Sequence, residues 1–396
     1  MKEQRYAWVV VWAAFVCLAV IFGVAYSFAA FFASFAAQFD AQRADVAFVF
    51  GLSGLLYFLL GAGGGMLADR FGPRAAAVAG MLCIALGLAG ASSADSLTLI
   101  YATYGIGVGV GIALVYTPAI ACVQPWFTQR RGLAAGIASA GIGAGTVAVP
   151  LLATLAIAAL DWRAALRVLA LGVLVVGIGA AWWLRRAPVV SAAPGAAGGR
   201  PSGETLAEAL RDRRFWWLYV AVALGAPGMF IPFAHVSAAA RDLGIDSARA
   251  VGLVGLIGIG SLVGRFAIGA LADRVGRRLT LALGLASMGL SFVLWWAGGG
   301  YAALAMFALW FGLSYGGIVS LLPAICMDLF GARAVASILG TLYTGAAAGN
   351  LLGPVAAGAV FDHTGSYAWV AWGSVALSLL AALAAARLLA LRGRSY

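Results

Sequence analysis

Long apolar runs follow one another along almost the whole of this 396-residue chain, and the charged residues gather between them. Hydrophobic residues make up 64% of the sequence and charged residues only 10%, more apolar surface than a water-soluble core could bury. Because about 20 apolar residues span a bilayer as a helix, we expect an all-α membrane protein. The predicted spans are twelve, with centres near Cys17, Leu56, Ile84, Val110, Ser139, Val173, Leu224, Ile259, Ala286, Leu313, Gly345 and Leu377.

A polar stretch from Ala187 to Arg214 separates the sixth span from the seventh and contains several prolines and arginines. Within it, Thr205 stands three residues before Glu208, which is the spacing of a capping box and predicts a short surface helix. The stretch predicts a linker between two halves. We expect three segments: an N-terminal six-helix bundle, 1–186, a cytoplasmic linker, 187–213, and a C-terminal six-helix bundle, 214–396.

The loop arginines orient the chain in the membrane. If the N-terminus lies in the cytoplasm, 19 of the 25 Lys and Arg residues fall on the cytoplasmic side, five fall outside and Arg265 lies within a span. We therefore expect both termini inside, a retained first helix rather than a cleaved signal peptide, and a bacterial inner (cytoplasmic) membrane as the location. The net charge of +11 then reflects topology and anionic lipid, not nucleic acid. The arginines predicted outside are Arg43, Arg163, Arg167, Arg241 and Arg249.

The four cysteines lie in apolar spans without paired or ligand-like spacing, so we expect neither a disulfide framework nor a metal or cofactor site. An enzyme would need a nucleophile and a base, or metal ligands, facing each other across spans. Two histidines, His235 and His363, and no acid within a span offer little for that purpose. We expect a monomeric protein that is not an enzyme.

A ten-residue motif is repeated in the two halves. Gly65–Arg74 and Gly269–Arg278 share the pattern Gly-x-x-x-Asp-Arg-x-Gly-x-Arg, and the same displacement relates Gly136 to Gly340. Parallel repeats of this kind are typical of transporters in which two bundles rock about a central site.

This motif, duplicated in a twelve-span chain, resembles the loops of the major facilitator superfamily, and the resemblance covers essentially the whole chain. In that family the loops latch the cytoplasmic gate in one state and release it in the other. The alternative, that both aspartates only punctuate turns, remains open. The resemblance implies gating roles for Asp69, Arg70, Arg74, Asp273, Arg274 and Arg278.

A narrower resemblance is to the monocarboxylate porter and oxalate/formate exchanger branch of that superfamily. It rests on motifs that occur in the expected order and at the expected helices. These are Trp126–Gly136, Ala140–Gly145, Phe230–His235, Arg241–Gly244 and Gly264–Asp273.

Arg265 is the arginine that lies inside an apolar span, eight residues before Asp273. At 1.5 Å per residue it stands about 12 Å deeper than the loop, which is far for a side chain to reach the interface. Since an intramembrane charge is costly, it indicates a functional site, and a guanidinium fork matches a carboxylate. The alternative is an arginine that binds a helix carbonyl or reaches toward the interface.

Neutral donors are expected beside Arg265. Tyr116, Tyr315 and Tyr343 sit at mid-span with polar tips and resemble positions at which the monocarboxylate branch contacts substrate. Each could equally be a packing tyrosine. Ser261 lies one helical turn before Arg265 and shares its face.

Two further polar residues carry open alternatives. Asn350 could bind substrate or join two helices, and the helix contact is slightly favoured. His235 has an ordinary pKa suited to a proton relay, or it is an interfacial histidine.

One positive charge in the span matches one negative charge on the cargo. Dicarboxylate exchangers in this branch often add a second cation in the eleventh span, where Tyr343–Ala346 has none. We expect a secondary transporter for lactate- or pyruvate-like monocarboxylates, a proton symporter that works by alternating access. Exchange of oxalate- or formate-like anions is the alternative, and a non-transporting receptor is less favoured. Efflux of cationic drugs would require a carboxylate within a span, and Asp328 is the one acid near a span.

Overall fold

A computed structural model of the chain describes residues 2–127, 131–187, 203–297, 299–331 and 333–391. Within these ranges, twelve helical spans are long and apolar enough to cross a membrane, and each contains one predicted centre, so that prediction is confirmed. The uninterrupted spans are α1 (Lys2–Phe39), α2 (Arg43–Phe71), α3 (Pro73–Ala91), α6 (Arg131–Ala159), α10 (Arg213–Asp242), α11 (Ser247–Val275), α12 (Arg277–Ala297), α13 (Tyr301–Phe330), α14 (Val335–Thr364) and α15 (Ala368–Ala390).

Two spans of the N-terminal bundle are interrupted by a π-helical turn. The fourth span consists of α4 (Leu97–Ile100), η1 (Tyr101–Gly105) and α5 (Ile106–Ala121). The sixth consists of α7 (Trp162–Gly172), η3 (Val173–Gly177) and α8 (Ile178–Ala181).

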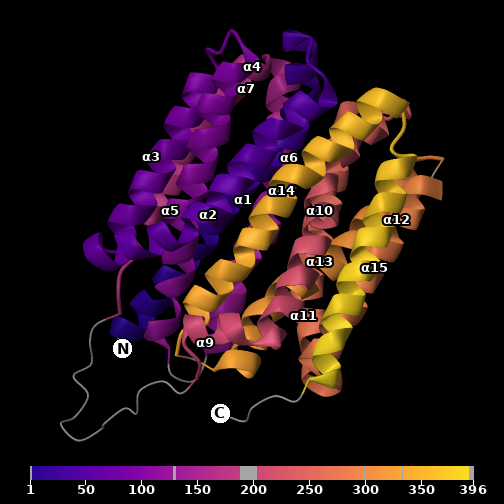
Figure 1. Ribbon diagram of the computed structural model, residues 1–396. Coiled ribbons are helices and arrows are strands. Elements are labelled where there is room, and N and C mark those ends of the chain that lie inside the picture. Colours follow the sequence, from indigo (N-terminus) through magenta and orange to yellow (C-terminus); the bar gives the residue numbers. More distant parts are fainter. Residues whose placement is uncertain (1, 128–130, 188–202, 298, 332, 392–396) are drawn as a thin grey trace, which may run out of the picture.

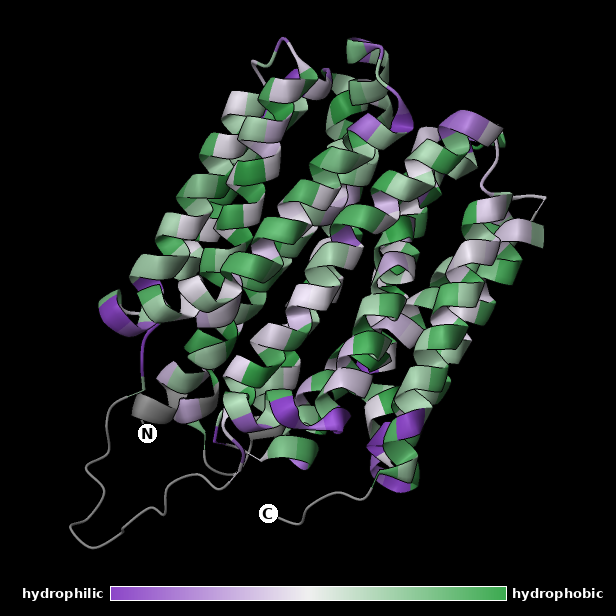
Figure 2. Cartoon of the chain, in the orientation of Figure 1, coloured by the Kyte–Doolittle hydropathy of each residue, from purple (hydrophilic) through white to green (hydrophobic). Residues whose placement is uncertain are grey.

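Apolar side chains cover the outside of the protein as well as its core. Leu86, Val175, Trp369 and Leu383 are between 65% and 70% exposed. Hydrophobic residues follow the helices over their length, whereas hydrophilic residues gather near the helix ends (Figure 2). Such surface is unfavourable in water but contacts lipid chains in a bilayer. The chain is an integral membrane protein.

The two six-helix bundles stand side by side, and α1 begins at the same end at which α15 finishes (Figure 1). We call this the terminal end, which carries the turns at Gly72 and Gly276. The opposite end carries the turns at 40–42, 243–246 and 365–367. The domain limits at 187 and 213 stay predictions, because residues 188–202 lie outside the described residues.

The sequence repeat has a counterpart in the packing of the two bundles. In the N-terminal bundle, a Cβ on Gly145 of α6 would overlap the backbone of Ala19 in α1. At the corresponding place in the C-terminal bundle, a Cβ on Gly349 of α14 would overlap Ala226 in α10. Small residues therefore allow the same helix pair to approach closely in each half.

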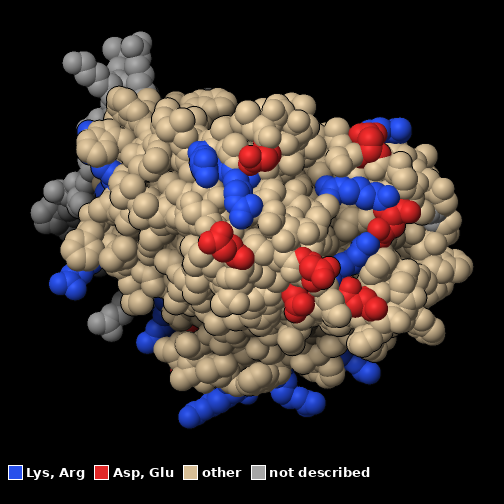
Figure 3. Space-filling model, turned by 90° about the horizontal axis from the view of Figure 1, so that it is seen from above, with Lys and Arg blue, Asp and Glu red and all other residues tan. Residues whose placement is uncertain are grey.

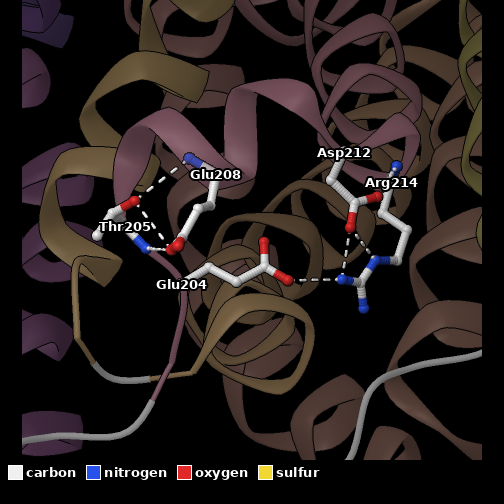
Figure 4. Close-up of polar contacts among 5 residues, drawn as sticks. All are labelled: Glu204, Thr205, Glu208, Asp212 and Arg214. Carbon is white, nitrogen blue, oxygen red and sulfur yellow. Dashed lines mark hydrogen bonds and ion pairs between the residues drawn. The ribbon is translucent and has the colours of Figure 1, made fainter.

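The predicted surface helix is α9 (Leu206–Arg211), and Thr205 caps it. Glu208 donates its N–H to the Thr205 hydroxyl at 3.3 Å, and its carboxylate accepts hydrogen bonds from the Thr205 N–H at 2.7 Å and hydroxyl at 2.9 Å (Figure 4). The hydrogen bond from the N–H, followed by that from the hydroxyl, lowers the pKa of the Glu208 carboxyl. The capping box is confirmed.

Arg214, at the start of α10, binds the end of the linker. Its Nη2 lies 2.9 Å from Oε1 of Glu204 and 2.5 Å from Oδ2 of Asp212 (Figure 4). Glu204 also donates its N–H to the carbonyl of Phe330, the last residue of α13, at 2.7 Å. The end of the linker is thus bound to the C-terminal bundle by ion pairs and a backbone hydrogen bond before α10 begins.

Candidate functional site

A cavity lies between the two bundles, with about 750 Å³ of atom-free space that includes its part open to solvent. Helices α1, α2, α5 and α6 line it from one side, and α10 to α14 line it from the other. Its lining is almost entirely aromatic or aliphatic, with few polar groups, as is typical of small-molecule sites. The cavity is therefore built jointly by the two halves.

Arg265 of α11 is the one charged side chain among the described residues that line the cavity. The residue is partly exposed, but its Nε is buried and has no hydrogen-bond partner. Within the described part of the chain, neither a carboxylate nor a helix carbonyl binds this guanidinium. A buried charged donor without a partner is unfavourable, and a bidentate carboxylate would satisfy it. The structure brings Arg265 to the cavity, and its role as a ligand stays a prediction.

The three tyrosines predicted for the pocket all line this cavity. Tyr116 comes from α5, Tyr315 from α13 and Tyr343 from α14. Three helices from the two bundles thus bring phenol groups to the cavity that Arg265 also lines.

Two more tyrosines, Tyr26 of α1 and Tyr57 of α2, line the cavity and were missed from the sequence. The hydroxyls of Tyr26 and Tyr315 lie 3.1 Å apart and form a hydrogen bond between the bundles. Both missed residues are tyrosines near mid-span, which is the signal that selected Tyr116. The same criterion, applied to the first two spans, would have found them.

Ser261 and Asn350 do not belong to the cavity lining. Ser261 is 3% exposed, and its carbonyl packs where a Cβ on Gly316 of α13 would lie. Asn350 is 2% exposed and donates from Nδ2 to the carbonyl of Gly51 in α2 at 3.3 Å. That contact is the helix contact favoured from the sequence, here between bundles. Substrate binding by either residue stays a prediction that this geometry does not favour.

His235 of α10 is 0% exposed and lies outside the cavity lining. Its Nε2 is 2.8 Å from the carbonyl of Pro354, and its Nδ1 is 3.0 Å from the hydroxyl of Tyr367. Because a carbonyl only accepts, Nε2 carries the proton, and Nδ1 of a neutral ring accepts from the tyrosine. The ring is buried rather than interfacial, and its role in proton coupling stays a prediction.

A group of side chains joins the bundles at the opposite end, and no expectation from the sequence included it. Arg43 of α2 binds Asp242 of α10 through Nη1 at 2.8 Å and Nη2 at 2.6 Å. Arg43 Nη1 also donates to the Tyr367 hydroxyl at 2.8 Å, and the guanidinium lies 3.7 Å from the ring centre of Phe361. Burial raises the pKa of the Tyr367 phenol, so it remains a donor to His235.

Asp362 of α14 adds a second contact at this end. Its carboxylate accepts hydrogen bonds from the backbone N–H groups of Arg43 at 3.1 Å and Ala44 at 3.0 Å. An acid at the N-terminus of α2 is therefore supplied by the other bundle. Seen from this end, acidic and basic side chains are interspersed across the surface (Figure 3). We call Arg43, Asp242, Asp362 and Tyr367 the opposite-end cluster.

The repeated loop motif at the terminal end makes its contacts within each bundle. In the first loop, the carbonyl of Asp69 accepts a hydrogen bond from Arg186, Arg70 lies 5.1 Å from the ring centre of Phe71, and Arg74 lies 4.8 Å from that of Trp182. The side chain of Asp69 is exposed.

The second loop shows the same preference for its own bundle. Asp273 lies 3.4 Å from Arg277, and Arg278 donates to the carbonyls of Leu388 at 3.1 Å and Leu391 at 2.9 Å. Arg274 is exposed in the last turn of α11. The gating roles of both loops stay predictions.

Comparisons with known proteins agree with this architecture. A family model described as the Major Facilitator Superfamily matches residues 14–340 and 227–395. Monocarboxylate transporter 13 of Bos taurus is 33% identical over 367 residues, which cover 92% of this chain and 85% of that protein. Monocarboxylate transporter 4 of Rattus norvegicus is 28% identical over 382 residues, which cover 93% and 80%.

A solved structure shares the fold. It is a crystal structure of the peptide transporter POT in complex with sulfate, with a TM-score of 0.73 and 16% sequence identity over 96% of this chain and 94% of that one. The relatives and the fold are those of transporters, not of enzymes. This chain therefore belongs to the major facilitator superfamily, in the branch that contains the monocarboxylate transporters.

Proposed function

We propose that this protein is a secondary transporter that carries organic monocarboxylates across the membrane, with Arg265 as the group that binds the carboxylate. The observation that carries the proposal is the buried Nε of Arg265, unpaired beside a cavity between the bundles. One fixed positive charge balances one carboxylate, and neighbouring phenols orient its oxygens. The monocarboxylate transporters among the relatives support this cargo class.

Alternating access is part of the same proposal. Toward the terminal end, the lining includes Leu281, in the second turn of α12, and Leu322. At the opposite end, the bundles are joined by the opposite-end cluster. We take this arrangement as the state that faces the terminal end. The lysine and arginine distribution supports a cytoplasmic terminal end, and the bacterial inner membrane remains our proposed location.

Coupling follows from how the charge of Arg265 is neutralised. If the bundles reorient only when Arg265 is paired, the bound anion itself permits the change, and a proton accompanies it in symport. Exchange of oxalate- or formate-like anions is the second candidate. It is favoured by the lack of Asp, Glu and His among the described lining residues, which leaves the cavity without an acid or base for a proton.

The test is uptake of labelled monocarboxylates, with lactate and pyruvate included, into proteoliposomes that contain the parent or Arg265→Gln. We expect the substitution to reduce uptake by at least about tenfold, since it removes a charged hydrogen-bond pair. Arg249→Gln is the matched control, because Arg249 lies on the same helix but is exposed at the opposite end. Equal uptake by the parent and Arg265→Gln would overturn the proposal.

A pH-sensitive dye inside the vesicles separates the two coupling modes. Acidification of the lumen in step with uptake supports proton symport. Counterflow of labelled acid without a change in lumenal pH supports exchange.

A further inference from the structure

Aromatic side chains make up much of the wall of the cavity. Phe22 and Phe58 come from the N-terminal bundle and Phe230 comes from the C-terminal one, in addition to the five tyrosines. Aliphatic side chains fill much of the rest, including Met229 and Leu285. A small hydroxy acid bound at Arg265 has no ring that could pack against these aromatic side chains.

The rings form one connected set, because Tyr57 and Phe58 lie 4.3 Å apart between ring centres and join its two sides. Phe22 meets Tyr57 at 5.9 Å between ring centres and an interplanar angle of 88°, and it meets Tyr116 at 5.7 Å and 82°. Phe58 meets Phe230 of the other bundle at 5.7 Å and 65°. Aromatic pairs prefer such tilted arrangements, so another ring is a favourable neighbour for these walls.

The polar groups of the lining are few. Tyr26, Tyr116, Tyr315 and Tyr343 line the same cavity as Arg265, and the hydroxyls of Tyr26 and Tyr315 share a hydrogen bond. Among the described lining residues, Arg265 is thus the single place for a charged end of a ligand, whereas rings and aliphatic chains make up most of the rest. This division suits a ligand with a carboxylate at one end and an apolar ring at the other.

We propose that the preferred cargo is an aryl-substituted monocarboxylate, whose carboxylate binds Arg265 and whose ring packs against Phe58 and Phe230. The inference rests on the proposed function and narrows it, since lactate and pyruvate become poor ligands of the same site. The ring group at Phe58 and Phe230 spans both bundles. An aromatic ligand placed there contacts both halves and favours their closure around it.

Lactate and 3-phenyllactate form a matched probe pair, because they differ only by one phenyl group. Binding is measured by ligand-induced stabilisation of the purified full-length protein, which avoids passive leakage of apolar acids through vesicles. We expect the Kd of 3-phenyllactate to be at least about tenfold lower than that of lactate, because an additional ring is buried. Arg265→Gln should abolish the response to both acids.

Phe58→Leu tests the aromatic contact at Phe58 and Phe230 directly. Phe48→Leu is its control on the same helix. Phe48 lies outside the cavity lining and packs against Tyr101, at 5.0 Å between ring centres. We expect Phe58→Leu to reduce the ratio of the lactate Kd to the 3-phenyllactate Kd by about threefold or more, because one aromatic contact is lost. Phe48→Leu should leave that ratio of Kd values unchanged. Equal effects of the two substitutions would overturn the proposed contact between the ligand ring and Phe58.

The remaining outcomes separate this inference from the proposed function. If lactate binds as tightly as 3-phenyllactate and Arg265→Gln abolishes both, the aromatic preference is wrong and the carboxylate site stands. If neither acid binds in an Arg265-dependent way, the proposed function fails and the inference fails with it.

Discussion

At the opposite end of the molecule, side chains of one bundle bind the other, whereas at the terminal end the charged residues of the loops bind within their own bundle. Arg43 and Asp242 form an ion pair between bundles. The pair of Arg277 and Asp328, at 2.8 Å, lies entirely within the C-terminal bundle. Among the described residues, no hydrogen bond or ion pair joins the bundles at the terminal end.

This difference in contacts between the bundles shows which end of the molecule holds the present conformation. A packed interface between bundles behaves as a two-state element, so the state is defined by the end at which cross-bundle contacts exist. Here those contacts include the partly exposed pair of Arg43 and Asp242 and the buried hydrogen bond that Ser237 donates to the carbonyl of Ala29 at 2.9 Å. The opposite end is therefore held closed by contacts between the bundles that a transporter must break to reopen there.

The largest expected effect comes from His235, which supports the opposite-end cluster from below. His235→Ala leaves the Pro354 carbonyl and the Tyr367 hydroxyl without their partner in a fully buried site. We expect a loss of stability of about 2–4 kcal/mol, from unsatisfied groups and from the space left by the ring. Thermal unfolding in detergent measures the loss.

Ser378→Ala is the control for His235→Ala. Ser378 is 0% exposed, and its hydroxyl has no hydrogen-bond partner, so its removal should cost little. If both variants unfold at the same temperature, His235 does not support this end. Proton coupling that persists in His235→Ala would also remove the histidine as a proton relay.

The next effect in size comes from Arg43→Ala, which removes the ion pair with Asp242 and the hydrogen bond to Tyr367. The Arg43 and Asp242 side chains are 21% and 38% exposed, so the expected change is about 1 kcal/mol, or about fivefold in favour of opening. Val319→Cys in the cavity wall, in a chain without its native cysteines, reports the opening. An impermeant thiol reagent should label it about fivefold faster from the opposite face.

Arg249→Ala is the control for Arg43→Ala, because Arg249 sits at the same end but pairs with Asp246 of its own bundle. It should leave labelling at Val319→Cys unchanged. If Val319→Cys is labelled at the same rate in Arg43→Ala and in Arg249→Ala, the proposed difference between the two ends is wrong.

The features that the sequence predicted share one property, which is that they arise from local patterns. Twelve spans, the capping box at Thr205 and the repeated loops follow from hydropathy or spacing along the chain. Arg265 was found because a charge in an apolar run is conspicuous wherever the helices pack. The three predicted tyrosines all line the cavity, as expected for mid-span phenols whose polar tips would be unfavourable in hydrocarbon.

The features that were missed depend on how distant helices meet. Arg43 and Asp242 are almost 200 positions apart; Arg43 was seen only as a loop charge that orients the chain, and Asp242 only as part of the Arg241–Gly244 motif. Ser261 was expected in the pocket because it shares a face with Arg265, but α13 packs over that face at Gly316. Helical spacing defines a face of a helix, and only tertiary packing decides what covers it.

A smaller effect is expected from Asp362→Asn. The carboxylate caps the first turn of α2 from the other bundle, and an amide keeps one acceptor oxygen but loses the charge. The expected change is about 0.5–1 kcal/mol, which increases labelling of Val319→Cys from the opposite face by about two- to fivefold. Asp246→Asn is the matched control, because Asp246 caps α11 within its own bundle. Similar labelling in the two variants would mean that capping across the bundles does not contribute to closure.

The smallest effect is expected from Arg277→Ala at the terminal end. Arg277 is 38% exposed and binds Asp273 and Asp328 of its own bundle, so its removal should change stability by less than about 0.5 kcal/mol. Because no cross-bundle contact is lost, labelling of Val319→Cys should be the same as in the parent from either face. Slower labelling from the opposite face would show that Arg277 binds the other bundle when the terminal end closes. In that case both ends could form contacts between the bundles, and they would differ only in which end is closed in a given conformation.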